Sequence, residues 1–215
     1  MSKPYSAEDF TNQIISDRTW RLREISDLKS AIRQSDQTME KVLLRALVTI
    51  SYAHWEGHVR NSAMLYLTHI ALRKFDYSRL NPQFMKNYFL PRLSALSASK
   101  VSLASKCALL DDILSSANKK FSRVNDDLVN TKSNLNSEVL REICLICGIS
   151  SASFEAYESF IDVILLKRRN DIAHGEDTFI AKTDMNELAA KTIELMRMFG
   201  DALDNEVQLK TYMIV

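Results

Sequence analysis

The sequence predicts an all-α protein, an antiparallel bundle of about four long helices with shorter helices in the middle of the chain. The 215 residues include only 4 Gly and 3 Pro, about 3% together, against roughly 12% in average usage. A β-sandwich needs such residues at its turns, and a Rossmann or P-loop protein needs a glycine-rich phosphate loop. Long runs of apolar residues at helical spacing are the second observation. We expect them to form one helical domain over residues 1–215.

The first two long helices are expected at residues 7–34 and 39–72. Ser6 and Asp9 have the spacing of a capping box before the first of them. The second is interrupted by one glycine, Gly57, which either kinks the helix or lets a neighbouring element approach closely.

Proline and polar residues divide the middle of the chain. Asn81-Pro82 predicts a turn or a helix start, and Pro91 predicts a second boundary. Residues 94–117 again predict a helix. Residues 121–136 are polar and weakly periodic, and they predict a loop with a short helix.

Three further helices are expected toward the C-terminus. Residues 137–147 precede Gly148, which suits the left-handed position after a helix. Residues 154–173 have one apolar face and end at His174-Gly175. Asp184 and Glu187 have capping-box spacing at the start of the last long helix.

Charge and cysteine content narrow the functional class. The net charge is only +1, whereas broad binding to nucleic-acid duplexes usually requires a basic excess. Three cysteines, an odd number, favour a reducing compartment over a disulfide framework. No segment has the apolar length of a signal sequence or membrane helix. We therefore expect a cytoplasmic protein that does not enter a membrane.

Most catalytic and metal-binding motifs are missing from the sequence. Cys144 and Cys147 have C-x-x-C spacing, but apolar residues lie between them and only one other cysteine is present. We interpret them as a buried helix face. Walker, H-E-x-x-H and G-x-S-x-G patterns are absent. We expect no cofactor and no bound metal.

The remaining candidate is the segment KRRNDIAHGE at residues 167–176, which contains Arg169 and His174. At about 100° per residue, Asn170 and Asp171 lie within about 60° of His174 on a helix. Arg169 lies about 140° away, but its long side chain can reach a phosphate shared with His174. The R-x4-H spacing alone is common by chance. A purely structural interpretation also stands, because cations and a final Gly are favoured where a helix ends.

Two distant segments together resemble the HEPN superfamily. RNDIAHG, at residues 169–175, is similar to its R-x4-6-H signature, in which Asn, Asp or His typically follows the Arg. AHWEG, at residues 53–57, resembles a stretch of prokaryotic MAE-type HEPN-like nucleases. The segments lie about 115 residues apart, in the order and helical setting of that family. The resemblance covers about residues 10–205, with no motif identified at about 95–135.

The resemblance implies a metal-independent endoribonuclease of a toxin–antitoxin or phage-defence system, acting on RNA as a homodimer with two motifs in one cleft. A protein antitoxin would be a further partner. Attack by the RNA 2′-OH would leave a 2′,3′-cyclic phosphate. His174 would serve as base and acid, Arg169 would clamp the phosphate, and Asn170 would orient the phosphate or ribose. The alternative is a non-catalytic HEPN-type binding or dimerisation module.

The resemblance also suggests supporting residues. Glu56 either points into the cleft or forms a buried structural ion pair, and Asp171 either fixes the tautomer of His174 or caps locally. Lys167, Arg168 and Arg60 are candidates for a basic rim that binds the RNA backbone.

Neighbours of Glu56 have separate expectations. His54 and His58 cannot both share its helix face, so we expect one to line the cleft and the other to lie at the surface. Tyr52 and Trp55 are expected to make core or dimer contacts.

Overall fold

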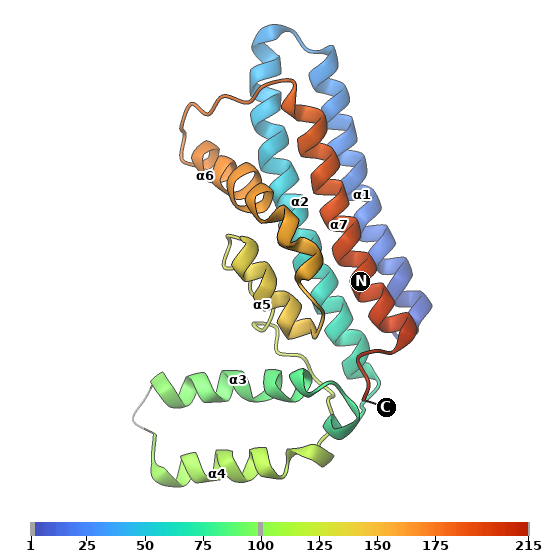
Figure 1. The fold of residues 1–215 in the computed structure, drawn as a ribbon, viewed down its shortest axis with the longest axis vertical. Coiled ribbons are helices and arrows are strands. Elements are labelled where there is room, and N and C mark those ends of the chain that lie inside the picture. Colours follow the sequence, from blue (N-terminus) through green and yellow to red (C-terminus); the bar gives the residue numbers. More distant parts are fainter. Residues whose placement is uncertain (1–2, 99–100, 215) are drawn as a thin grey trace.

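The computed structural model describes residues 3–98 and 101–214, and the chain is helical over most of them (Figure 1), which confirms the all-α prediction. Its α-helices are α1 (Ala7–Gln34), α2 (Gln37–Leu72), α3 (Pro82–Ala98), α4 (Leu103–Leu114), α5 (Ser137–Cys147), α6 (Arg168–Ala173) and α7 (Asp184–Leu209). Three 3₁₀ turns are η1 (Tyr77–Arg79), η2 (Ser116–Asn118) and η3 (Ala152–Tyr157), and η4 (Phe160–Lys167) is a π-helix.

The long helices α1, α2 and α7 pack side by side, with α1 antiparallel to the other two (Figure 1). Capping residues in the sequence fix where α1 and α2 begin. Ser6 and Asp9 form the predicted capping box, with both backbone-to-side-chain bonds at 2.9 Å. Asp36 caps α2 by accepting from the backbone N–H groups of Thr38 and Met39. None of the described helices is long and apolar enough to cross a bilayer.

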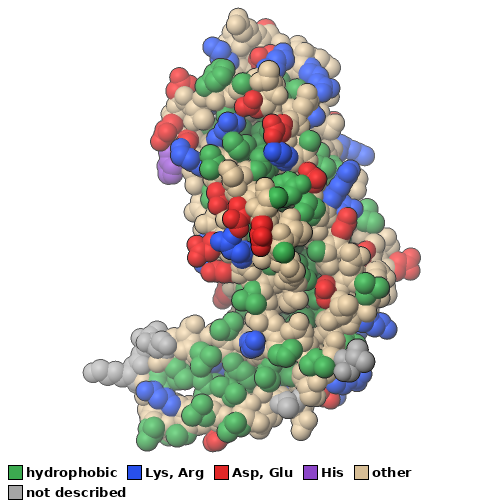
Figure 2. All heavy atoms as spheres, in the orientation of Figure 1, with side chains coloured by type: hydrophobic (Ala, Val, Ile, Leu, Met, Phe, Trp, Pro, Cys, Tyr) green, Lys and Arg blue, Asp and Glu red, His purple; other side chains and the backbone are tan. Residues whose placement is uncertain are grey.

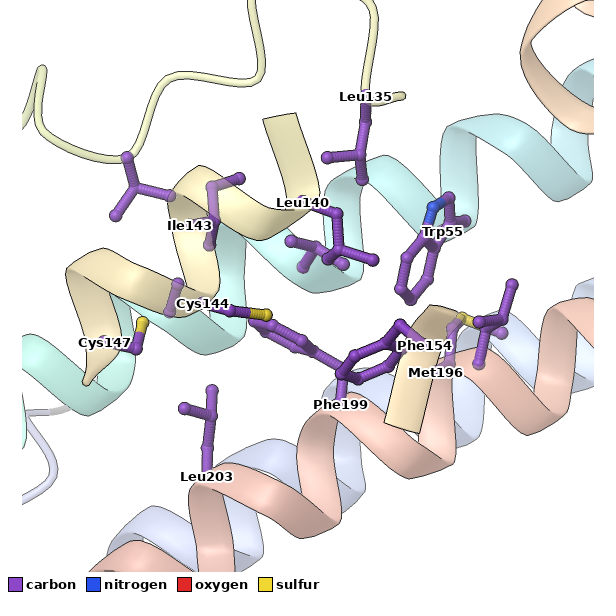
Figure 3. Close-up of a cluster of buried hydrophobic side chains, with 14 of the residues drawn as sticks. Trp55, Leu135, Leu140, Ile143, Cys144, Cys147, Phe154, Met196, Phe199 and Leu203 are labelled. Atoms are coloured by element: carbon purple, nitrogen blue, oxygen red, sulfur yellow. The ribbon is translucent and has the colours of Figure 1, made fainter. Parts of the chain in front are cut away.

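One part of the hydrophobic core lies where α5 packs on α2 and α7 (Figure 3), and buried residues of α1 extend it. Trp55 from α2 meets Phe199 from α7 edge to face, with ring centroids 6.4 Å apart. Cys144 and Cys147 are fully buried in the same cluster, as expected, and burial raises the pKa of Cys144 to about 12. Gly148 closes α5 in the left-handed conformation, at φ 74°. These cysteines and Trp55 are therefore core residues.

A buried polar cluster joins α1 to α2 and α7. Asp17 accepts two hydrogen bonds from Arg21, at 2.9 and 3.0 Å, and lies 2.8 Å from Nδ1 of His58. Burial alone would raise the pKa of Asp17, but hydrogen bonds from His58 and Arg21 outweigh it and lower the pKa. A Cβ on Gly57 would lie 2.7 Å from Nη1 of Arg21. Gly57 therefore lets α1 approach closely.

Both histidines beside Glu56 are buried, which corrects the expectation that one lines a cleft and the other lies at the surface. The Nε2 atom of His58 lies 2.9 Å from the Met196 carbonyl oxygen. His54 packs against Trp20 and lies 2.7 Å from a Glu24 carboxylate oxygen. Partners on α1 and α7 thus bind both imidazoles within the bundle.

Helices α3 and α4 project from one end of the bundle as an arm (Figure 1). Pro91 lies inside α3, so the predicted boundary there is wrong. A proline inside a helix loses the hydrogen bond to the carbonyl four residues earlier, and its ring crowds that carbonyl. Helix α3 nevertheless continues past Pro91 to Ala98. The helix predicted at 94–117 is also wrong as one element, because α4 starts afresh after Ser102, whose side chain caps it. Residues 99–100 of that prediction lie outside the described residues.

Residues 121–136 form a loop, as predicted, but the short helix expected within it is replaced by turns. The side chains of Asn125 and Asn130 accept from the backbone N–H groups two residues later, at 3.1 and 2.7 Å. Such local bonds compete with helix formation. The segment is therefore an ordered loop without a helix of its own.

The helix predicted at 154–173 is a succession of η3, η4 and α6, so it is not a regular α-helix. The capping box predicted at Asp184 and Glu187 is also wrong. Thr183 occupies the cap position of α7 without a side-chain cap bond, and the Asp184 carboxylate instead lies 3.5 Å from Nη1 of Arg168. The contact of Asp184 with Arg168, 16 residues earlier, takes the place of the predicted capping hydrogen bond.

Candidate active site

Arg169 is the best-positioned polar residue of the predicted site. Helix α6 packs against α2 and places the Arg169 guanidinium over the ring of Tyr52, 4.1 Å from its centroid. Nη2 of Arg169 donates to the Ser133 carbonyl at 2.8 Å. Nε is buried and has no hydrogen-bond partner among the described residues. An unpaired buried N–H group is unusual in a native fold and calls for an explanation, of which a bound anion is one.

Tyr52 forms a rigid platform beneath that guanidinium. The residue is 2% exposed, and its hydroxyl oxygen accepts from the backbone N–H of Leu135 at 2.6 Å. Burial raises the pKa of Tyr52, so its phenol stays neutral at physiological pH. The neutral ring provides a cation–π contact that holds Arg169 in place.

The loop before α5 covers the start of the motif. Asn170 Nδ2 donates to the side-chain oxygen of Asn134 at 3.2 Å. Lys132 and Ser133 both have φ near 55°, a conformation that costs roughly 1–2 kcal/mol per non-glycine residue. The structure holds these two residues in that conformation where the Ser133 carbonyl contacts Arg169.

His174 lies at the other end of α6 and is exposed to solvent. Its backbone N–H donates to the Asn170 carbonyl at 2.9 Å, and Gly175 follows with φ 84°, as the sequence predicts. Nη1 of Arg45, on α2, donates to the Glu176 carbonyl at 2.8 Å and secures the chain beyond the motif. Within residues 3–98 and 101–214, no hydrogen bond or ion pair joins His174 to Arg169.

The predicted supporting residues, Glu56 and Asp171, form no hydrogen bond or ion pair with His174 in the described chain. Glu56 is half-buried one turn after Tyr52, and its charge helps to raise the pKa of Tyr52. It forms no ion pair with Arg169 or His174 in the part of the chain that the structure describes. Asp171 accepts from Lys167 at 2.9 Å rather than contacting His174.

The residues of the predicted basic rim have different neighbours. Arg168 faces Asp184, at 3.5 Å. Arg60 is exposed and borders two surface hollows of about 440 and 250 Å³, and Asp126 lines both of them. The Asp126 carboxylate opposes phosphate binding in these hollows. The smaller one is also lined by Ser133, whose carbonyl accepts from Arg169.

Sequence reasoning missed the partners of the motif. Tyr52 was expected to make core or dimer contacts, and Ser133 and Asn134 lie in a segment without a recognised motif. The available signal was the position of Tyr52, one turn before Glu56 on the same helix. The described residues include no group of three or more His, Cys, Asp or Glu placed to hold a metal ion.

The arrangement combines a half-buried guanidinium on an aromatic platform with an exposed imidazole at the end of the same short helix. A family model described as RiboL-PSP-HEPN matches residues 16–205. No curated protein and no solved structure matches the chain. Because the match spans most of the chain, and because the described residues are mostly helical, the chain belongs to the RiboL-PSP-HEPN family.

Proposed function

We propose that the protein is a metal-independent endoribonuclease in which Arg169 and His174 carry the reaction. Membership of a HEPN-type family supports a nuclease or RNA-binding module. The observation that favours catalysis is the state of Arg169, whose guanidinium lies on Tyr52 and keeps a buried Nε without a partner among the described residues. A phosphate is an anion that such a group binds well.

The side chains suit cleavage by the 2′-OH of RNA itself. The reaction needs a base to take the 2′-OH proton, an acid to protonate the departing 5′-oxygen, and positive charge beside the phosphorane oxygens. His174 is exposed and takes the proton-transfer roles, because one imidazole nitrogen can accept a proton while the other donates one. Arg169 stabilises the phosphorane, and Asn170 orients the phosphate or the ribose. The products are a 2′,3′-cyclic phosphate and a free 5′-hydroxyl.

The composite site requires a homodimer in this proposal. Arg169 faces α2 and the loop before α5, whereas His174 faces solvent at the end of α6. A second copy that presents its own motif supplies the second imidazole, so that base and acid act on opposite sides of one phosphate. We further propose that the protein acts in the cytoplasm as a toxin or phage-defence effector, with a protein antitoxin as partner.

The second candidate function is a non-catalytic RNA-binding or dimerisation module of HEPN type. It is favoured by the contacts that the motif makes within its own chain, since Ser133 accepts from Arg169 and Asn134 accepts from Asn170. In that case the motif stabilises the loop rather than a transition state.

Cleavage of single-stranded RNA by the wild type beside Arg169→Ala and His174→Ala separates the two functions. We expect each variant to lose at least about 100-fold in rate, and wild-type products to carry 2′,3′-cyclic ends with or without EDTA. Arg23→Ala, an exposed substitution on α1, is the matched control. The proposal is contradicted if the Arg169→Ala/His174→Ala double variant cleaves RNA at the wild-type rate. It is also contradicted if EDTA abolishes cleavage by the wild type. The module instead predicts lower melting temperatures for Arg169→Ala and no cleavage by any form.

A further inference from the structure

A second candidate site lies at the base of the arm, away from the motif. A cavity of about 470 Å³ opens between α3 and the start of the loop that follows η2. Its lining includes two tyrosines and four cations: Tyr77, Tyr88, Arg92, Lys119, Lys120 and Arg123. The volume lies within the range of small-ligand sites. Figure 2 shows hydrophobic side chains gathered over this arm, with Lys and Arg among them.

The aromatic wall is rigid and partly open. Tyr77 is buried and packs against Tyr88 and Phe121, with ring centroids 5.8 and 5.9 Å away. Burial raises the pKa of Tyr77 to about 12, so the wall is uncharged. Tyr88 also packs edge to face on Phe89 and remains 42% exposed. The Arg92 guanidinium also lies over the Tyr88 ring, 6.0 Å from its centroid. A planar ligand would therefore contact the exposed part of a ring that already has a cation beside it.

The charged part of the lining is positive. Arg92 and Lys119 share one carboxylate, that of Asp112. Lys120 and Arg123 are exposed, and their side chains have no hydrogen-bond or ion-pair partner in the described chain. The lining contains no Asp or Glu. The lining therefore has an excess of positive side chains in a protein whose net charge is only +1.

We infer that this cavity binds a segment of single-stranded RNA, with an unpaired base against Tyr88 and backbone phosphates at Lys120 and Arg123. The inference rests on the proposed function, for which it names the form of the substrate and a contact away from the scissile phosphate. A ligand for this lining needs a flat apolar face and negative charge, which a nucleotide combines. A base in a duplex cannot stack on a side chain, because its faces are covered by its neighbours.

The cavity and the motif are connected by one stretch of chain. The backbone N–H of Phe121 donates to the Phe75 carbonyl at 2.9 Å and fixes the start of the loop at the cavity. Ser133, at the far part of this loop, contacts Arg169. The thirteen residues from 121 to 133 make twelve Cα-to-Cα steps, which span at most about 43 Å. One strand of RNA can therefore contact both places.

Fluorescence anisotropy with a fluorescein-labelled 20-nucleotide oligouridylate tests the inference, in an Arg169→Ala/His174→Ala background that prevents cleavage. We expect Lys120→Ala/Arg123→Ala to raise the Kd at least 10-fold. The slope of log Kd against log salt should fall by about 1.4, since each single-strand phosphate contact contributes about 0.7. Tyr88→Ala should raise the Kd by about 10-fold, whereas Tyr88→Phe keeps the ring and should bind like the background protein.

Arg23→Ala/Lys41→Ala, which removes two exposed cations from α1 and α2, is the charge-matched control. Melting curves verify that the compared variants are folded. The inference is overturned if the Arg169→Ala/His174→Ala background protein does not bind the probe. It is also overturned if the cavity variants bind the probe as tightly as the Arg23→Ala/Lys41→Ala control does. Cavity-dependent binding without any wild-type cleavage rejects the ribonuclease and supports this RNA site. Wild-type cleavage with binding indifferent to the cavity rejects the RNA site and supports the ribonuclease.

Discussion

Tyr52 connects the core to the motif through its two ends. Its ring lies under Arg169, while its hydroxyl oxygen accepts from the buried N–H of Leu135. These contacts are separable by substitution. The ring accounts for the position of the guanidinium, and the hydroxyl accounts for the position of the loop.

Replacing Tyr52 by Phe keeps the ring and leaves the Leu135 N–H unpaired. We expect the free energy of unfolding to fall by about 1–3 kcal/mol in urea titrations, because an unpaired buried donor loses its solvation. Tyr66→Phe is the matched control. The Tyr66 hydroxyl is buried without a hydrogen-bond partner among the described residues, so its removal should cost nothing. Equal losses for both variants would contradict this role of Tyr52.

The proposed reaction adds a second expectation for Tyr52. Tyr52→Leu removes the platform and should lower the rate of RNA cleavage by at least about 10-fold, whereas Tyr52→Phe should stay within a few-fold of wild type. Single-turnover cleavage assays check this comparison. A slower Tyr52→Phe than Tyr52→Leu would exclude the ring as the positioning element.

His69 makes stability depend on pH. Burial lowers the pKa of His69, the hydrogen bond to the Pro4 carbonyl opposes that effect, and the nearby Arg73 lowers the pKa further. The folded state therefore favours neutral imidazole. The stability from this preference is present above the unfolded pKa of about 6.5 and is lost as pH falls through the folded value.

His69→Asn should flatten the fall in melting temperature between pH 7 and pH 5, since an Asn amide keeps a donor for the Pro4 carbonyl and does not titrate there. A remaining slope is expected from His54, whose pKa burial also lowers. Thermal melts across this pH range check the comparison. An unchanged slope in the variant would show that His69 does not carry the effect.

At the scale of helices, two glycines allow close packing. Gly57 faces Arg21, and a Cβ on Gly200 would lie 3.1 Å from Ile14 and 3.2 Å from Nε2 of His58. Both glycines therefore lie against side chains of α1. Gly200 also lies against His58, which contacts Asp17 of α1. Helix propensity alone favours alanine at each position by about 1 kcal/mol.

Gly57→Ala should nevertheless destabilise the protein by about 1–3 kcal/mol, because the new methyl group displaces a guanidinium that is bound to Asp17. Urea unfolding measures the change. Gly175→Ala is the contrasting control: nothing lies within 4 Å of its Cβ, but its φ of 84° costs an L-residue roughly 1–2 kcal/mol. Stabilisation by Gly57→Ala would show that Arg21 moves aside at little cost.

Local signals in the sequence predict much of the helical framework. The Ser6 capping box, the length of α2 and Gly148 at the end of α5 follow from nearest-neighbour chemistry, and each is confirmed. Pro91 and Asp184 were misjudged because their environments outweigh local preference. The π-helix η4 also escaped prediction, since its pattern of apolar residues resembles that of an α-helix.

The candidate site was predictable only in part for a similar reason. Arg169 and His174 are recognisable as a motif in one short segment. The contact of Arg169 with Tyr52 joins residues more than 100 positions apart, and no local pattern records it. His54 and His58 were misplaced because Glu24 and Asp17, on another helix, bind them.

For the whole molecule, the orientation of the motif predicts assembly. Arg169 and His174 point to different surroundings within one chain, so the proposed reaction needs two chains. Light scattering should give a mass near 49 kDa, twice the chain mass of 24.6 kDa, at concentrations where RNA is cleaved. A mass of one chain under those conditions would exclude the composite site.

The base of the arm has a consequence for how related chains differ in length. The backbone N–H of Tyr77 donates to the Lys119 carbonyl at 2.9 Å, and Asp76 pairs with Lys120 in a short antiparallel bridge. The chain thus leaves the bundle and returns to it at one closed point. Insertions and deletions between α3 and α4 are absorbed beyond that closure without shifting α2 or α5. Family members are therefore expected to vary most in length at the far end of the arm.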